Sequence, residues 1–293
     1  MSGLGKFFIS LVVFAAICAA GLYWFVNHEV ERAFNQAVSD VPGLIVSYDD
    51  ISVRFSDQSV ILEGVEAALP GGQRVSADEV RFSSFDQKNP VPHFAAAQAR
   101  GVLMRVTPAN FGTWAAPLLS MGVREVRGDL AVDYAYAPAS QALTVRTLSL
   151  SAPELGEVSL TGTVDRLDLD QLRVEKLLGL RLVNVDLIYE DHAMVTMLLR
   201  SSARLLGISP DEARQRILAE ISTMARYSAR EGNGVAERAL LGLAEFVAEP
   251  GRVVVSARPD EPVPVLYFFM GRDFYENLHL LNVSVTTDYE RDI

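Results

Sequence analysis

The sequence contains few groups of residues that could carry out chemistry. Its histidines are His28, His93, His192 and His279, and none lies within four residues of another. A local two-histidine zinc motif is therefore excluded, although a site assembled from distant histidines stays open. The signatures of a serine nucleophile, a zinc-binding helix and a phosphate-binding loop are also absent. We assign no catalytic, cofactor-binding or metal-binding residue, and we expect a protein that is not an enzyme.

Two short groups still have to be weighed. Asp165, Asp168 and Asp170 carry carboxylates that suit calcium or magnesium, but we favour polar positions of an alternating strand. Glu190-Asp191-His192 resembles a catalytic cluster, but we favour helix capping by Asp191, which leaves a hydrolase as a distant third hypothesis. Asn282-Val283-Ser284 fits a glycosylation sequon, and a plain strand segment is the alternative.

The chain has a single cysteine, Cys18, which limits disulfide bonding, metal binding and lipid attachment. No intrachain disulfide can form, and no cysteine-based metal site can form beyond the apolar stretch that contains it. The preceding residue, Ile17, is bulkier than the small residue expected before a lipid-modified cysteine. We therefore do not expect lipid attachment.

An uncharged apolar stretch, residues 7–26, is the strongest signal in the chain. A helix of about 20 residues is roughly 30 Å long, which matches the hydrocarbon core of a bilayer. Lys6 lies before the stretch and the acidic Glu29 follows it, so residues 1–6 are predicted to be cytoplasmic and the chain from 27 onwards to be exported. The alternative is a cleaved signal peptide, with small residues at 15–20.

The formal net charge of the chain is −11. Such a charge argues against a nucleic-acid partner and against binding of anionic lipid head groups through a basic patch.

Residues 27–190 are predicted to form a β-rich region. A short helical continuation to about residue 41 comes first, and apolar and polar residues then alternate with a period of two. The predicted strands fall at 44–48, 51–55, 60–67, 75–85, 102–106, 123–136, 143–150, 158–169 and 180–189. Short turns between them indicate antiparallel pairing.

Three helices are predicted within residues 191–250. The first runs from Asp191 to about Leu206 and ends at Gly207. Ser209-Pro210-Asp211-Glu212 predicts a capping box at the start of the second. A third helix follows Gly232-Asn233-Gly234, and residues 251–293 return to strands at 253–256, 265–269 and 278–285.

The predicted fold class is therefore mainly β with a helical insert (α+β). An N-terminal transmembrane helix precedes an exported antiparallel sheet, and the insert is expected to pack on one face or end of that sheet. An open, groove-like apolar face and an ordinary core covered by the helices are both consistent with the pattern.

The apolar N-terminal stretch and three segments that follow it resemble the opening of AsmA-like bacterial envelope proteins. The segments are Ile51-Ser-Val-Arg-Phe55, Val60-Ile-Leu-Glu-Gly-Val65 and Val75-Ser-Ala-Asp-Glu-Val-Arg-Phe82. The resemblance implies an inner-membrane protein of a Gram-negative bacterium that faces the periplasm and acts in lipid transport or envelope homeostasis. About ten strands at roughly 4.8 Å span about 50 Å, too short to bridge two membranes. We expect either a lipid-handling protein with phospholipid as its ligand, or a non-catalytic scaffold for another envelope protein.

Overall fold

The computed structural model describes Gly43 and residues 45–54, 59–86, 89, 91–169, 179–269 and 273–288. The predicted membrane segment 7–26, its alternative as a signal peptide, and Cys18 and Asp170 lie outside these residues. Among the described residues, no helix is both long and apolar enough to span a bilayer. The chain divides into two compact units. Unit 1 contains the described residues up to Tyr136 together with Thr147–Ala152, and unit 2 contains Ala137–Arg146 and the described residues from Pro153 onwards.

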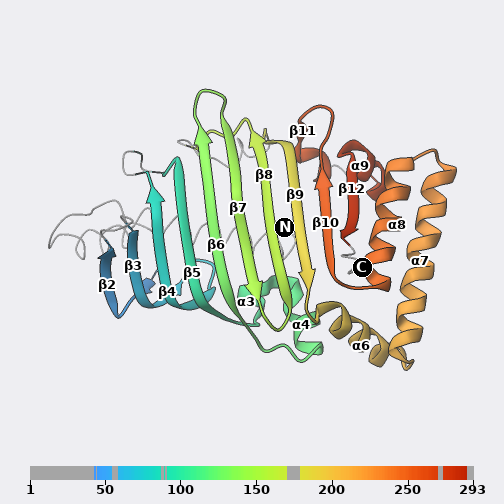
Figure 1. The fold of residues 1–293 in the computed structure, drawn as a ribbon, viewed down its shortest axis with the longest axis horizontal. Coiled ribbons are helices and arrows are strands. Elements are labelled where there is room, and N and C mark those ends of the chain that lie inside the picture. Colours follow the sequence, from blue (N-terminus) through green and yellow to red (C-terminus); the bar gives the residue numbers. More distant parts are fainter. Residues whose placement is uncertain are drawn as a thin grey trace, which may run out of the picture. The chain divides into compact units, whose positions relative to one another are not determined.

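Unit 1 is built on antiparallel strands, as the short turns predict (Figure 1). Its strands are β1 (Ile45–Ser47), β2 (Asp50–Arg54), β3 (Ser59–Ala68), β4 (Arg74–Phe85), β5 (Phe94–Arg105) and β6 (Glu125–Ala137). The order in the sheet is β1-β3-β4-β5-β6, and β2 also pairs with β3. The strands therefore follow one another as a meander.

One face of the unit 1 sheet is apolar and buried. Cross-strand pairing brings one residue from each of β3, β4, β5 and β6 into the same row. One such row contains Leu62, Val80, Ala99 and Leu130, all at most 5 % exposed. This face is therefore part of the core of unit 1.

A β-bulge at Gly101 keeps this apolar face continuous along β5. The register with β6 shifts between Ala99 and Val102, so both side chains stay on the buried face. Gly101 has a φ of 60°, and a Cβ at this position would overlap the carboxylate of Asp78. Its N–H donates to Oδ1 of Asp129 at 2.9 Å. Glycine is therefore required here by both conformation and space.

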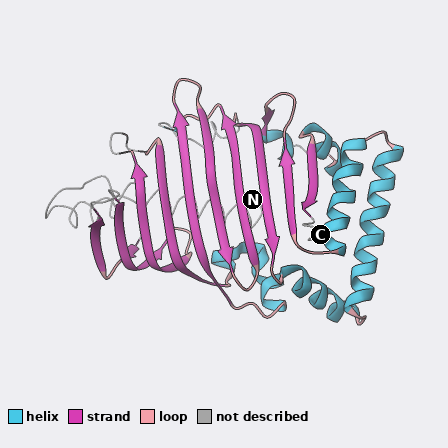
Figure 2. Cartoon of the chain, viewed as in Figure 1, coloured by secondary structure: helices cyan, strands magenta, loops and turns pink. Residues whose placement is uncertain are grey.

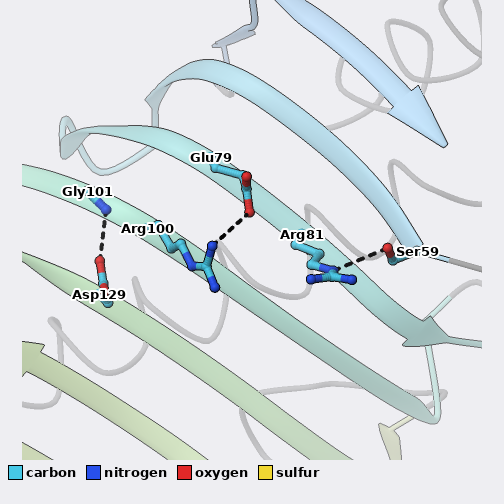
Figure 3. A network of polar contacts seen from close by, with 6 residues as sticks. All are labelled: Ser59, Glu79, Arg81, Arg100, Gly101 and Asp129. Atoms are coloured by element: carbon cyan, nitrogen blue, oxygen red, sulfur yellow. Dashed lines mark hydrogen bonds and ion pairs between the residues drawn. The ribbon is translucent and has the colours of Figure 1, made fainter. Parts of the chain in front are cut away.

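Polar contacts cross the same strands (Figure 3). Nε of Arg81 donates to Oγ of Ser59 at 3.2 Å, which links β4 to β3. Arg100 Nη1 lies 3.8 Å from Glu79 Oε1, linking β5 to β4. Because both side chains of the second pair are partly exposed, this ion pair contributes little stability.

A short helical connection between β5 and β6 contains α3 (Pro108–Phe111), η1 (Gly112–Trp114) and α4 (Ala115–Ser120). Asn110 is buried there, and its side-chain amide takes part in three hydrogen bonds. Its Nδ2 donates to the carbonyl oxygens of Arg74 and Arg105, at 3.1 and 2.8 Å, and its Oδ1 accepts the N–H of Arg74 at 2.9 Å. These bonds satisfy the buried amide and anchor the connection to β4 and β5.

Unit 2 contains a second set of antiparallel strands (Figure 2). They are β8 (Gly156–Asp165), β9 (Arg181–Asp191), β10 (Arg252–Ala257), β11 (Val263–Pro264) and β12 (Val283–Asp288). The pairing order is β8-β9-β10-β12, and β11 also pairs with β9. The residues of β7 (Ala142–Ala152) are divided between the two units.

The predicted helical segment forms α6 (Met194–Leu206), α7 (Pro210–Arg230) and α8 (Gly234–Ala248). Gly207 ends α6 in the left-handed conformation, with a φ of 66°. The capping box is confirmed: Oγ of Ser209 accepts the N–H of Glu212 at 3.2 Å, and the Glu212 carboxylate accepts the N–H of Ser209 at 2.8 Å. These signals are local, which explains why the sequence predicts them.

Helices α6 and α8 pack on one face of the unit 2 sheet, as expected for the insert. Val195 of α6 and Phe246 of α8 share a cluster with Val253 of β10. A Cβ on Gly242 of α8 would overlap the carbonyl oxygen of Val285, so α8 lies very close to β12. The helices therefore cover β10 and β12 and also contact Tyr189 and Val185 of β9.

In unit 2, one predicted strand is present but shorter than predicted and another is wrong, both for local reasons. The strand predicted at 158–169 ends at Asp165, because Arg166 takes a φ of 58° that breaks the extended chain. Residues 265–269, read as an apolar strand, form the 3₁₀-helix η3 (Val265–Phe269). A short apolar run does not distinguish these states by periodicity.

The last predicted strand also differs. Residues 278–285 contain the end of α9 (Phe274–Leu280), a turn at Asn282 with a φ of 46°, and the start of β12. In unit 1, by contrast, the strand predicted at 102–106 begins earlier, at Phe94. Its first half is rich in alanine, which has a low strand propensity.

Candidate functional site

An apolar face on β8 and β9 stands out within unit 2. Antiparallel pairing places Val158 opposite Tyr189, Leu160 opposite Leu187, and Gly162 opposite Val185. Since side chains alternate between the two faces of a strand, these residues share one face. We call Val158, Leu160, Val185 and Leu187 the apolar sheet face.

The helices cover this sheet unevenly. On β10, Val253 and Ala257 are buried beneath residues of α6 and α8. On β8 and β9, the members of the apolar sheet face are all only partly buried. Val185 of β9 packs against the cluster that contains Ala239 of α8, so the helices reach one end of the apolar sheet face. The other three members, Val158, Leu160 and Leu187, are also only partly buried and leave apolar surface on β8 and β9.

Gly162 separates Leu160 from Val164 on β8 and contributes no side chain to the apolar sheet face. A Cβ there would lie 2.7 Å from the carbonyl oxygen of Asn184 on β9. The glycine thus allows close approach of the two strands, and it leaves a gap in the row of side chains between Leu160 and Val164.

The opposite face of the same strands is mostly polar. It carries Ser159, Thr161 and Thr163 from β8, and Asp186 together with the apolar Ile188 from β9. Arg258 Nη2 lies 3.0 Å from Asp186 Oδ2. A hydrogen bond from Ser256 lowers the pKa of Asp186 below its ordinary value; burial opposes this shift, and the hydrogen bond and charge of Arg258 add to it. Strands β8 and β9 are therefore amphipathic, with most of their polar side chains on one side.

The aspartates considered for a metal ion do not form one group in the described residues. Asp165 ends β8, and its carboxylate accepts two hydrogen bonds from Arg181, at 2.8 and 2.6 Å. This bond and the charge of Asp165 raise the pKa of Arg181. Asp168 lies beyond the strand, so the strand explanation holds for Asp165 and not for Asp168. Among the residues that the structure describes, no group of three or more histidine, cysteine or acidic residues could hold a metal ion.

Asp191 accepts a hydrogen bond from the first turn of α6, although Ala193 and not Asp191 occupies the N-cap position. Its Oδ1 accepts the N–H of Val195 at 3.0 Å and lies 2.8 Å from the hydroxyl of Tyr189. The helix begins at Met194 and not directly after Asp191, because the N–H groups of residues 192–194 all point to the carbonyl oxygen of Leu155 at 3.3 Å. His192 is exposed, with Nδ1 3.2 Å from the carbonyl oxygen of Pro153.

The other residues that the sequence analysis considers, Asn282, His279 and His93, are not part of the apolar sheet face. Asn282 is exposed in a turn, where its Nδ2 donates to the carbonyl oxygen of Arg258 at 3.3 Å. His279 lies in α9, and the ring of His93 packs edge-on against Tyr136 in unit 1, with 5.0 Å between centroids.

A buried polar cluster in unit 1 was not predicted. Asp86 is 5 % exposed, and its Oδ2 accepts hydrogen bonds from Nδ2 of Asn89 at 2.5 Å and from the N–H of His93 at 3.1 Å. Burial, and then the charge of Asp86, raise the pKa of Tyr134 to about 12. The Tyr134 hydroxyl donates to the carbonyl oxygen of Pro92 at 3.0 Å. These bonds organise the connection between β4 and β5.

An aromatic cluster in unit 2 also escaped prediction. The rings of Tyr227 and Tyr275 have centroids 5.4 Å apart, and those of Phe274 and Tyr275 are 5.8 Å apart. Nδ2 of Asn233 donates to the carbonyl oxygen of Tyr275 at 2.8 Å. Tyr227 and Phe274 are each about half exposed. Their separation in sequence, on α7 and α9, gives no local signal.

Comparison with known proteins adds one finding. Residues 149–288 match the model of a family that is described only as an uncharacterized protein. The match covers slightly less than half of the chain and includes the whole of the apolar sheet face. No curated protein matches the chain.

Proposed function

We propose that the chain is a lipid-handling protein of the bacterial envelope, anchored by residues 7–26 in the inner membrane, with its two units in the periplasm. Acyl chains of a phospholipid bind along the apolar sheet face of β8 and β9. The protein supplies binding, and no chemical step is involved.

The observation that carries this proposal is the difference between the strands of unit 2. The helices bury Val253 and Ala257 of β10, but Leu187 of β9 and Leu160 of β8 remain partly exposed, as does Val255 between the two buried residues of β10. Each methylene removed from water on such a face is worth about 0.8 kcal/mol. The other face carries a row of serine and threonine residues on β8, with Ile188 of β9 as an apolar neighbour, so the proposal names the more apolar side of the sheet.

A pair of substitutions on neighbouring residues tests the proposal. Leu160→Asp places a charge on the apolar sheet face, and Thr161→Asp places the same charge on the polar face. We expect phospholipid that copurifies with the detergent-washed full chain to fall severalfold for Leu160→Asp and to stay unchanged for Thr161→Asp. Equal lipid content in both variants would contradict the proposal.

A membrane-anchored scaffold is the second candidate, and the aromatic cluster favours it. Tyrosine and phenylalanine are enriched in protein interfaces, and Tyr227 and Phe274 are both accessible. A photo-reactive residue in place of Phe274 would be expected to crosslink one envelope protein in cells. The same residue at exposed Leu241 of α8 serves as the control, and equal crosslinking from both would contradict a specific interface.

A further inference from the structure

The C-terminal half of α6 combines exposed leucines with arginines. Leu205 is 82 % exposed and Leu206 is 55 % exposed. Arg200 and Arg204 are also exposed. We call these four residues the α6 tip.

The rest of α6 is accounted for by packing. Val195, Leu199 and Ala203 are buried, and the first two face the core of unit 2. Arg204 in the last turn also has a favourable interaction with the helix dipole. Neither effect explains two adjacent leucines in water at the end of the helix, because exposing them forgoes the gain from burial.

The local charge is opposite to that of the whole chain. The net charge is −11, yet Met194–Leu206 contains two arginines and no acidic residue. The next acidic residues are Asp211 and Glu212, and the Glu212 carboxylate is engaged by Ser209 in the capping box. The global charge therefore does not describe this segment.

We propose that the α6 tip docks on an anionic lipid bilayer, with Leu205 and Leu206 entering the interface and Arg200 and Arg204 contacting phosphate head groups. A helix end with apolar side chains and flanking arginines suits the boundary between head groups and acyl chains. Each arginine near an anionic surface adds to the attraction, and salt weakens it. The docking does not depend on acyl-chain binding at the apolar sheet face.

The test uses the full chain held in nanodiscs of phosphatidylcholine. The predicted membrane segment is then already inserted in a bilayer and does not bind the added vesicles. We expect these nanodiscs to float with added vesicles that contain phosphatidylglycerol, and not with vesicles of phosphatidylcholine alone. The double variant Leu205→Ser/Leu206→Ser should bind at least about tenfold more weakly. Arg200→Gln/Arg204→Gln should lose about tenfold on the anionic vesicles.

Leu241→Ser, at another exposed leucine of unit 2, is the matched control and should bind like the wild type. Failure of the wild type to float with anionic vesicles would overturn the proposal, as would an equal loss for Leu241→Ser. If an envelope protein copurifies with the wild type but not with the double variant, and flotation is unchanged, the α6 tip binds protein. That result would also overturn the proposal. Copurified phospholipid should be the same in wild type and double variant, which separates this result from the proposed function.

Discussion

The hydroxyl of Tyr189 lies 2.8 Å from Oδ1 of Asp191, the carboxylate oxygen that also accepts the N–H of Val195 at 3.0 Å. This relationship joins the sheet to the start of α6. Burial, followed by the hydrogen bond and the charge of Asp191, raises the pKa of Tyr189 above its ordinary range. The acidic group that looks catalytic in the sequence thus has a structural role in unit 2.

Removal of the Asp191 carboxylate should destabilise unit 2. Asp191→Ala loses the cap of α6 and the partner of Tyr189, and we expect a loss of about 1–2 kcal/mol in the free energy of unfolding. Denaturant titration followed by circular dichroism measures the change. Glu190→Ala, at the exposed neighbour, is the control, and an equal loss there would show that the cap is unimportant.

The raised pKa of Tyr134 predicts a loss of folding stability at alkaline pH. Its pKa is raised to about 12, so the folded chain holds the phenolic proton more tightly than the unfolded chain, in which the pKa is about 10. The stabilising contribution is complete below pH of about 10 and is lost as pH rises towards about 12. Near pH 11 the loss is about 1 kcal/mol.

Tyr134→Phe should remove this component of the alkaline loss, and Tyr227→Phe, at an exposed tyrosine, should not. Thermal unfolding near pH 9 and pH 11 provides the comparison. An unchanged alkaline loss in Tyr134→Phe would contradict the assignment to this group.

Gly101 should tolerate alanine poorly. Gly101→Ala places a Cβ against the Asp78 carboxylate at a φ of 60°. Gly232→Ala is a matched control, because Gly232 has a φ of 75° but no atom within 4 Å of the added carbon. We expect about 1 kcal/mol from the backbone conformation in both variants and a further loss only in Gly101→Ala. Equal melting temperatures would show that Asp78 moves aside without cost.

Local signals in the sequence predict local structure well. The capping box at Ser209, the end of α6 at Gly207 and the strands β3 and β4 all depend on signals from neighbouring residues, and all are present. The alanine-rich half of β5 was missed because its pairing with β4 and β6, rather than propensity, makes it a strand. The run at Val265–Phe269 has no periodicity that separates a strand from a helix.

The candidate site could be predicted only in part. Alternation identifies the apolar side chains of β8 and β9, but whether Leu160 is covered depends on where α6 and α8 pack. The aromatic cluster of Tyr227 and Tyr275 and the tip at Leu205 depend on the tertiary fold in the same way. The sequence around Gly162 does not predict its close contact with β9, because that contact is made between strands.

Position-specific photo-crosslinking of lipid tests the central claim most directly. A photo-reactive amino acid is introduced into the full chain at Leu160 or Leu187 on the apolar sheet face, and at Thr161 or Ile188 on the opposite face. After irradiation in the envelope, phospholipid adducts are measured by mass spectrometry. We predict adducts at the first two positions and not at the second two. Equal labelling of both faces, or no adduct at Leu160 and Leu187, would contradict the account.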